Sequence, residues 1–420
     1  MPLLLTGIGD GARMVAALEQ STVDVVVWEA DHGLWHDVLD RIPLRPWLES
    51  GRLKLLLGPD RLHAPALGEA VEDVHPDLAR YLGWTRTLCD AHRPVLLAMA
   101  GELFVDDTGA AFESHGWRRY LWDRAHLPAI ENAHILRTCG AALLWRINTA
   151  ADVCEDASEA GIPAAIWEID PTLDGPARLR QPLPTSTVFT YRKANVSAHV
   201  QAGYGKSHYL PLATAPGHMG AVRDAPELHA DIAFVGSSMV ESARTLMDRL
   251  WTVLPPSPAV RARVQQVMQL QSQRLDRWMV PALMDRLLPG VRARAQAAHG
   301  GLDPALLIGE HIAALRRLNV LAPLVPLGLK VWGDAGWSLL HDKGADWRGP
   351  ADHFRDIPTI YRHAKINVDI GRIYQQDIVT MRVFDVLGAG GFLLAEHSDA
   401  LAELFTIGEE LDTWRTTEEL

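Results

Sequence analysis

The chain has 420 residues, of which 48% are hydrophobic, and its 52 acidic side chains outnumber its 40 lysines and arginines. At roughly 100–200 residues per domain, this length predicts two or three domains with cores that need no disulfide or metal. The net charge of −12 argues against a nucleic-acid partner, because binding phosphates requires a basic surface.

Cysteine spacing and hydropathy predict the cellular location of the protein. Cys89, Cys139 and Cys154 lack the spacing of a disulfide framework or a zinc site, so we expect a reducing, cytoplasmic location. The N-terminal residues do not form a signal peptide, and no window approaches the ~18 apolar residues of a membrane span. The 14 tryptophans are interpreted mainly as core residues, with stacking on a ligand as the alternative.

Short β-branched apolar runs alternate with amphipathic stretches of helical period along the whole chain. This alternation is typical of βαβ units, so the predicted fold class is α/β with parallel sheets. The strands expected in the first half are Pro2–Thr6, Val23–Trp28, Leu53–Leu57, Val95–Met99, Ala142–Ile147, Ala164–Ile169, Thr187–Tyr191 and Ser207–Leu210.

Three glycines, Gly7, Gly9 and Gly11, follow the first expected strand and precede a helical run. Glycines at such a turn let backbone N–H groups approach a ligand at the N-terminus of the helix. Glu29 ends the second strand, where a ribose-binding carboxylate would lie, and residues 58–60 (Gly-Pro-Asp) follow the third. The pattern is similar to the first motif of class I methyltransferases. A tight turn without a ligand is the alternative.

The second half begins after Ala213–Leu228, which is rich in Pro, Gly and Ala and is predicted to be a linker. A long helical block is expected from Ser242 to about Leu321, interrupted by prolines. The strands expected around this block are Asp231–Val235, Leu329–Trp332, Ile366–Asp369 and Gly391–Ala395. Two α/β halves joined by a linker predict two Rossmann-like domains facing a cleft, where ligands usually bind.

The helical block is locally basic although the chain is acidic. Its charge would suit an anionic acceptor, a membrane surface or self-association into a homo-oligomer, and an ordinary solvated helix face is the alternative. The arginines concerned are Arg261, Arg263, Arg274, Arg277, Arg286, Arg292 and Arg294.

The last residues, Thr416–Leu420, resemble the capped first turn of a helix. Because no further residues follow this turn, we expect that the chain was cut at this boundary or lacks a C-terminal extension.

Two motifs in the second half suit a nucleotide. Gly236 and Ser237 lie at a strand-to-helix turn, where N–H groups and hydroxyls can hold a phosphate, although a plain Gly-Ser turn is the alternative. Arg382 and Asp385 are three residues apart on one helix face, with Asp377 eight residues before Asp385. Arginine can bind a pyrophosphate and a carboxylate can accept both ribose hydroxyls. A surface ion pair is the alternative.

The segment from Asp231 to Leu420 resembles the C-terminal half of the CgeB-like (spore-maturation type) glycosyltransferases of the GT-B class. Residues 161–172 and 187–213 resemble the end of the same family's N-terminal half. The first hundred residues or so resemble the methyltransferase-like module of some CgeB-like and motility-associated-factor glycosyltransferases. The pieces that carry the main resemblance are Phe234–Ser237, Gly328–Trp337, Ile357–Arg372 and Met381–Leu411.

The resemblance implies a GT-B fold with two Rossmann-like domains. The first would span residues 1–220, with a methyltransferase-like portion at 1–95 and an acceptor-side portion at 135–220. The second would span 226–420, bind the nucleotide-sugar and contain a helical insertion at 242–321.

The resemblance also implies roles for particular residues. Arg382, Gly236 and Ser237 would hold the diphosphate, and Asp385 the ribose, although the family usually has Glu at this position. Gly333 and Asp334 would border the base. Tyr361 and Asn367 would line the same side, with a structural role as the alternative for each.

The resemblance implies a metal-independent hexosyltransferase that requires no cofactor. Its donor would be a UDP-, GDP- or dTDP-sugar, and its acceptor a surface polysaccharide or a protein. Asp170 is our candidate for the general base, with His32 and His208 as alternatives.

Three other functions remain open. Gly7–Gly11 and Glu29 would serve an S-adenosylmethionine-dependent methyltransferase. Alternatively, the protein binds a nucleotide-sugar or acts as a scaffold without turnover. A metal-dependent GT-A enzyme would use Glu168 and Asp170, a near match to its D-x-D motif.

Overall fold

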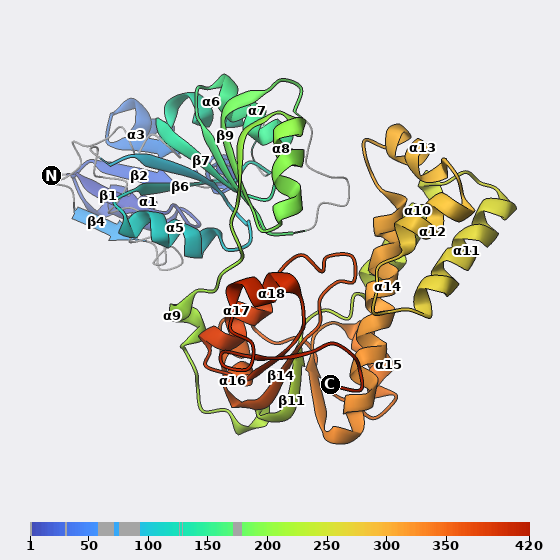
Figure 1. Cartoon of the computed structure of the whole chain (residues 1–420). Coiled ribbons are helices and arrows are strands. Elements are labelled where there is room, and N and C mark those ends of the chain that lie inside the picture. Colours follow the sequence, from blue (N-terminus) through green and yellow to red (C-terminus); the bar gives the residue numbers. More distant parts are fainter. Residues whose placement is uncertain are drawn as a thin grey trace. The chain divides into compact units, whose positions relative to one another are not determined.

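The computed structural model describes residues 2–29, 32–57, 71–74, 93–125, 127, 129–170 and 179–420 (Figure 1). The Gly-Pro-Asp motif at 58–60 and the side chain of His32 lie outside the described part. The described residues form two compact units. The first contains the chain up to Ile169, residues 179–189 and His199–His208, and the second contains Asp170, Thr190–Ala198 and Tyr209–Leu420.

The first unit begins with a four-stranded parallel sheet in the order β3-β2-β1-β4. Its strands are β1 (Leu3–Thr6), β2 (Val25–Glu29), β3 (Leu53–Leu57) and β4 (Val71–Val74). Its helices are α1 (Ala12–Gln20), α2 (His32–Arg41) and α3 (Arg45–Glu49). All five residues of β2 are buried, as expected for a central strand of a parallel sheet.

A second sheet of the same unit has the order β10-β9-β8-β7-β5-β6. Its strands are β5 (Val95–Met99), β6 (Arg118–Trp122), β7 (Ala141–Ile147), β8 (Ala164–Glu168), β9 (Leu183–Thr190) and β10 (Tyr204–Tyr209). Its helical segments are α5 (Val105–Ser114), α6 (Ala129–Thr138), α7 (Ala151–Glu159), η4 (Lys193–Asn195) and α8 (Val196–Ala202), of which η4 and residues 196–198 belong to the second unit. Leu4 and Trp28 share one core with Leu97 and Leu144, so the two sheets pack together.

The second unit contains one six-stranded parallel sheet in the order β13-β12-β11-β14-β15-β16. Its strands are β11 (Ala230–Val235), β12 (Leu329–Trp332), β13 (Asp346–Trp347), β14 (Ala364–Asp369), β15 (Leu393–Glu396) and β16 (Asp412–Trp414). The shorter helical segments are α9 (Pro216–Met219), η5 (Pro226–Leu228), η6 (Ala322–Leu327), η7 (Ala335–Trp337), α15 (Ser338–His341), α16 (Ile357–His363), α17 (Met381–Gly388) and α18 (Asp399–Leu404). From β11 the chain adds β12 and β13 on one side of the sheet, and it then adds β14, β15 and β16 on the other. Ligands of open α/β sheets bind at the carboxyl ends of the strands where the strand order changes side in this way.

The predicted helical block forms five helices, and prolines lie at their ends. These helices are α10 (Val240–Val253), α11 (Pro258–Ser272), α12 (Val280–Leu287), α13 (Val291–Ala298) and α14 (Pro304–Leu321). Most residues of α14 are buried, and the Asp303 side chain caps it by accepting a hydrogen bond from the Ala305 N–H at 2.9 Å. Ile373 and Tyr374, from the loop after β14, complete the apolar core of the block.

The tryptophans serve mainly as core residues, as predicted. Trp28, Trp122, Trp337 and Trp414 are among the largest fully buried side chains. Trp278 is only partly buried.

None of the described helices is long and apolar enough to cross a membrane. At the C-terminus, Thr416–Leu420 forms one turn, in which the Glu419 N–H donates to Thr416 Oγ1 at 3.3 Å.

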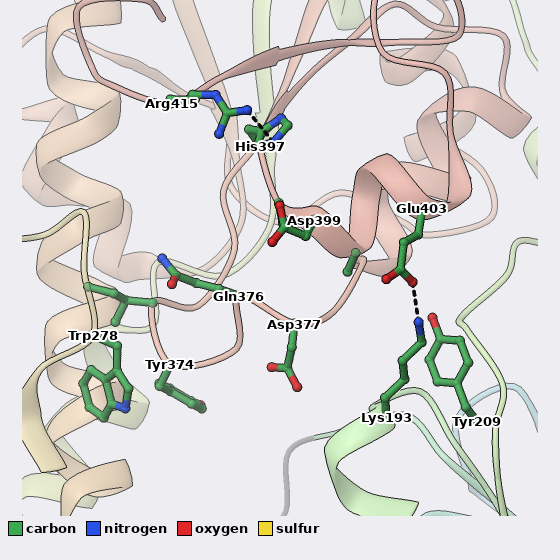
Figure 2. A pocket seen from close by; sticks show the side chains of 13 residues that line it. Lys193, Tyr209, Trp278, Tyr374, Gln376, Asp377, His397, Asp399, Glu403 and Arg415 are labelled. Carbon is green, nitrogen blue, oxygen red and sulfur yellow. Dashed lines mark hydrogen bonds and ion pairs between the residues drawn. The ribbon is translucent and has the colours of Figure 1, made fainter.

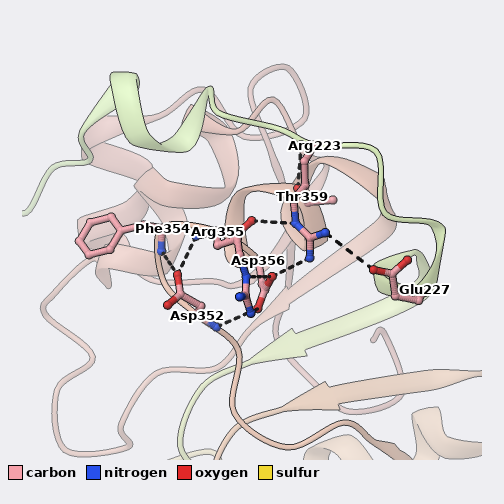
Figure 3. A network of polar contacts seen from close by, with 7 residues as sticks. All are labelled: Arg223, Glu227, Asp352, Phe354, Arg355, Asp356 and Thr359. Atoms are coloured by element: carbon pink, nitrogen blue, oxygen red, sulfur yellow. Dashed lines mark hydrogen bonds and ion pairs between the residues drawn. The ribbon is translucent and has the colours of Figure 1, made fainter.

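The segment predicted to be a linker is fixed to the second unit by an ion-pair network (Figure 3). Arg223 Nη2 donates to Asp356 Oδ1 at 2.7 Å, and the Arg223 N–H donates to Thr359 Oγ1 at 3.0 Å. Arg355 donates to both carboxylate oxygens of Asp356 at 3.0 Å. These hydrogen bonds, those from Arg355 foremost, hold the pKa of Asp356 well below its usual range.

Asp356→Asn should lower the free energy of unfolding at pH 7 by about 1–3 kcal/mol, because charge-assisted hydrogen bonds are lost. The pKa of Asp356 is lower in the folded state, so its contribution is present above the unfolded pKa of about 3.9 and is lost as the pH falls below it. Urea denaturation at pH 7 and pH 3 measures both effects. The exposed Asp342→Asn is the control, and an equal loss there would contradict the account.

Candidate functional site

Two loops meet at the carboxyl edge of the second unit's sheet, after β11 and β12. Gly236 and Gly333 each have φ of 155°, a conformation that favours glycine. A Cβ on Gly333 would lie 2.1 Å from the carbonyl oxygen of Gly236, so the backbones touch there. Trp337 Nε1 donates to the same oxygen at 2.8 Å. The predicted Gly236 and Gly333 are therefore brought together.

The carboxylate of Asp334 holds these two loops in place. It accepts hydrogen bonds from the Ser237 hydroxyl at 2.6 Å, from the Ser238 N–H at 2.8 Å and from the Gly336 N–H at 3.0 Å. Burial raises the pKa of Asp334, but the hydrogen bonds from Ser237 and Ser238 outweigh it, so this pKa lies below its usual range. Asp334 and Ser237 are thus in direct contact, and the aspartate stabilises the loop after β11.

Arg382, in the first turn of α17, connects the ends of the two central strands. Its Nε donates to the carbonyl oxygen of Val235 at 2.8 Å, and its Nη1 contacts Asp369 Oδ1 at 2.5 Å. The guanidinium lies 4.7 Å from the ring centroid of Phe234. A Cβ on Gly236 would lie 2.5 Å from Arg382 Nη2, so only glycine leaves room for this nitrogen. Arg382 therefore lies beside the Gly-Ser turn, as predicted.

A second arginine reaches the same turn from α14. Arg317 is 7% exposed, and its Nη1 donates to the carbonyl oxygen of Ser237 at 2.5 Å. Burial, and then repulsion from Arg382 and Arg372, lowers the pKa of Arg317 to about 9. Such crowding of cations favours an anionic ligand. We refer to Arg317, Arg372 and Arg382 as the arginine cluster.

The loop after β14 is fixed by two acidic residues, of which Glu310 is buried and Glu396 is partly buried. Arg316 Nη1 donates to Glu396 at 2.8 Å, and the Gly371 N–H donates to the same carboxylate at 3.2 Å. Arg372 Nε lies 3.2 Å from Glu310, which also accepts a hydrogen bond from the Tyr374 hydroxyl. The loop therefore has a defined conformation at the edge of the sheet.

Asp385 lies one turn after Arg382 and has a different partner. It is 7% exposed, and its Oδ1 accepts a hydrogen bond from the Thr214 hydroxyl at 2.6 Å. Burial raises the pKa of Asp385, and the Thr214 hydroxyl opposes this rise only in part. The structure therefore places Asp385 near the arginine cluster along α17 but bonded to the segment after β10.

Tyr361 and Asn367 are both buried and have structural contacts, as the alternative interpretation anticipated. Asn367 Nδ2 donates to the carbonyl oxygens of Tyr361 at 2.9 Å and Phe392 at 3.1 Å, which connects α16, β14 and β15. Burial raises the pKa of the Tyr361 phenol above its usual range, although the neighbouring Arg382 opposes this. Only Tyr361 is therefore next to the arginine cluster.

A cavity of about 570 Å³ opens at the same edge of the sheet, beside the ends of β14, β15 and β16 (Figure 2). Polar and aromatic side chains dominate its wall. The residues that line it are Lys193, Tyr209, Trp278, Ile373, Tyr374, Gln376, Asp377, His397, Ser398, Asp399, Ala400, Glu403 and Arg415. Of the predicted residues, only Asp377 lies here, and it pairs with Arg192 at 2.7 Å.

The N-terminal glycine loop has the predicted turn, but its acidic residue has a partner within the loop. Gly7, Gly9 and Gly11 all have positive φ. Glu29 is 2% exposed and accepts a hydrogen bond from the Ile8 N–H at 2.8 Å. Glu29 ends β2, as expected, and stabilises the glycine loop through this oxygen, while its role toward a ribose stays a prediction.

The two carboxylates near the end of β8 have different surroundings. Glu168 is fully buried 3.2 Å from His199, whose pKa burial lowers to about 4. Asp170 and His208 are exposed, and His208 packs against Phe189 with ring centroids 6.0 Å apart. Glu168 is therefore enclosed within the first unit, whereas Asp170 is exposed. No group of three or more metal-ligating side chains occurs among the described residues.

Sequence reasoning missed several residues of the site. Arg316, Arg317 and Glu396 were not singled out, although Arg316 and Arg317 are adjacent at the end of an apolar helical run, a signal for two buried cations. The wall of the cavity was also missed, because it combines residues more than 200 positions apart in the chain, such as Lys193 and Arg415.

Comparison with known proteins gives one family match. The model of the family described as "Glycosyl transferase-like" matches residues 311–420, and no curated protein sequence matches the chain. Among solved structures, the chain is similar to Anabaena Alr3699/HepE in complex with UDP and glucose. That similarity has 11% identity and a TM-score of 0.39, and covers 78% of this chain and 88% of that one. Residues 311–420, which run from within α14 to the C-terminus and include the arginine cluster, are thus similar to a glycosyl transferase-like family.

Proposed function

We propose that the protein is a GT-B type glycosyltransferase that uses a nucleotide-sugar donor and needs no metal. One observation carries the proposal. The segment similar to glycosyl transferases, residues 311–420, supplies all three members of the arginine cluster, and these lie where β11 and β14 end. Cations at this edge suit a diphosphate, since bidentate arginines and backbone N–H groups bind phosphate oxygens strongly.

In the proposed reaction an acceptor hydroxyl attacks the anomeric carbon of the donor sugar. The bond from that carbon to the phosphate oxygen breaks, and the nucleoside diphosphate leaves with the electron pair. Arg382 and Arg317 would stabilise the negative charge that develops on it, as a metal does in other enzymes. The Ser237 hydroxyl and the backbone after β11 would add hydrogen bonds, and Gly333 with Asp334 would border the base.

Several further assignments belong to the proposal. Asp170 would accept the proton of the attacking hydroxyl, with His32 and His208 as alternatives. Tyr361 would help to position Arg382 on the donor side of the site. Asn367 would act only indirectly, through its hydrogen bond to the Tyr361 carbonyl oxygen. The transferred group would be a hexose and the acceptor a polysaccharide or a protein. The buried thiols of Cys139 and Cys154 support a cytoplasmic location.

Asp385→Ala should weaken donor binding about 10- to 100-fold, because a carboxylate contact to the ribose hydroxyls is lost. Thermal-shift measurements with UDP-, GDP-, dTDP- and CMP-sugars and with S-adenosylmethionine test this, since a ligand that binds only the folded state raises its stability. Asp385→Glu, the residue usual in the CgeB-like family, should retain the shift. Asp231→Ala at the opposite end of β11 is the control.

An unchanged shift in Asp385→Ala would refute the ribose assignment. Stabilisation by S-adenosylmethionine alone would contradict the glycosyltransferase function and favour the methyltransferase. Donor binding without hydrolysis or transfer would identify a non-catalytic binding protein.

A further inference from the structure

The cavity beside β14, β15 and β16 is lined by Asp377, from the motif predicted to suit a nucleotide, but not by the residues to which we assign donor contacts. None of Gly236, Ser237, Arg382 and Asp385 lines it. Its volume of about 570 Å³ falls within the range of about 300–1,000 Å³ that is typical of small-molecule sites. Such sites are usually lined by apolar side chains, whereas Ile373 and Ala400 are the only aliphatic residues in this wall.

One side of the cavity presents aromatic rings in fixed positions. Trp278 and Tyr374 lie 5.8 Å apart, with their rings inclined by 53° (Figure 2). The Tyr374 hydroxyl is bonded to Glu310, and a Cβ on Gly309 would lie 2.8 Å from the Tyr374 ring and 3.0 Å from Trp278, so the helix packs closely against both. Within the described part of the chain, the Trp278 indole N–H has no hydrogen-bond partner.

The opposite side presents polar groups, some paired and some not (Figure 2). Lys193 pairs with Glu403 and lies 5.1 Å from the Tyr209 ring centroid. Asp399 is exposed and, among the described residues, its carboxylate has no ion-pair or hydrogen-bond partner. A carboxylate with open acceptor positions in the same cavity as a ring with a free N–H suits a ligand rich in hydroxyl groups.

His397 and Arg415 form the end of the cavity. Arg415 Nη2 donates to His397 Nε2 at 2.6 Å, so this imidazole nitrogen acts as the acceptor. Partial burial, followed by repulsion from Arg415, lowers the pKa of His397. Arg415 has no carboxylate partner for its guanidinium among the described residues, which leaves it, like Asp399, free to bind a ligand.

A small cavity of about 30 Å³ links this wall to the arginine cluster. It is lined by Asp369 and Thr380, and it shares Gln376, His397 and Ser398 with the larger cavity. Asp369 in turn contacts Arg382 at 2.5 Å. The larger cavity therefore adjoins the arginine cluster through this smaller one, which Arg372 also lines.

We propose that this cavity binds the carbohydrate acceptor, with one sugar ring packed on Trp278 and its hydroxyls bonded to Asp399. The acceptor role rests on the proposed glycosyltransferase function, whereas carbohydrate binding itself does not. An aromatic face packs against the C–H groups of a sugar ring while carboxylate and N–H groups bind its hydroxyls. A peptide or lipid segment would require the apolar wall that this cavity lacks.

Saturation-transfer NMR on the full chain tests the proposal with methyl glycosides of glucose, galactose, mannose and N-acetylglucosamine at about 10 mM, a range suited to weak binding. At least one glycoside should bind, and Trp278→Ala and Asp399→Asn should each weaken it about 10-fold or more. Asp399 is exposed, so Asp399→Asn tests the site without disturbing the core. Trp251→Ala, in the same helical block but stacked on Arg261 outside the cavity, is the control.

Nucleotide binding is measured on the same samples, which separates the two proposals. If a nucleotide-sugar binds but no glycoside does, or if both variants bind glycosides normally, the carbohydrate site is wrong and the transferase function stands. If glycosides bind through Trp278 and no nucleotide binds, the carbohydrate site is supported and the transferase function, together with the acceptor role, is contradicted.

Discussion

Arg382→Lys should lower kcat/KM for the nucleotide-sugar donor by about 100- to 1,000-fold while the chain remains folded. Lysine keeps a positive charge beside Asp369. Its single nitrogen cannot at the same time replace the arginine Nε, which donates to the Val235 carbonyl oxygen, and the arginine Nη2, which lies beside Gly236. The geometry that we assign to diphosphate binding is therefore lost, and the buried carboxylate keeps a partner. Release of nucleoside diphosphate from the donor measures the effect.

Arg362→Ala provides the matched control for this variant. Arg362 is an exposed arginine on α16 whose Nη1 donates to the Gly390 carbonyl oxygen at 2.7 Å. We expect its kcat/KM to be unchanged. If Arg382→Lys keeps normal kcat/KM, Arg382 does not bind the diphosphate and the role of the arginine cluster is wrong.

Arg316→Ala should lower the free energy of unfolding by about 3–5 kcal/mol, because Glu396 is left charged without its buried partner. Arg316 is 4% exposed and also donates to the carbonyl oxygens of Leu275 at 2.6 Å and Gly371 at 3.3 Å. Its removal therefore frees the loop after β14 as well. The unfolding transition in urea, followed by tryptophan fluorescence, measures the loss.

The exposed pair of Arg348 and Asp346 is the control, and Arg348→Ala should cost less than about 1 kcal/mol. The double variant Arg316→Met with Glu396→Leu should recover part of the loss, since both charges of the pair are removed together. A loss in Arg316→Ala no larger than that in Arg348→Ala would show that the pair of Arg316 and Glu396 does not stabilise the loop.

Strands with continuous apolar sequences were predictable from the sequence. β2 and β5 are buried along their whole length, so their Val- and Leu-rich runs indicate central strands directly. Missed strands lack this signal. β6 begins with two arginines and buries only alternate residues, and β13 has two residues at the edge of its sheet.

The proximity of some candidate site residues was predictable from local motifs, whereas their chemical roles stay predictions. Gly236, Ser237 and Arg382 are recognisable from a strand-to-helix turn and a helix pattern, and the structure places them together. The partners of buried side chains were not predictable, because they are set by tertiary packing. Thr214 precedes its partner Asp385 by 171 residues, and Arg317 follows Ser237 by 80.

The most direct test of the central claim is release of nucleoside diphosphate by the full chain, measured with UDP-, GDP- and dTDP-sugars in the presence of EDTA. The account predicts release from at least one donor, with EDTA leaving the rate unchanged and Arg382→Lys lowering it about 100-fold or more. No release from any of these donors, or release that requires a divalent metal, would contradict it.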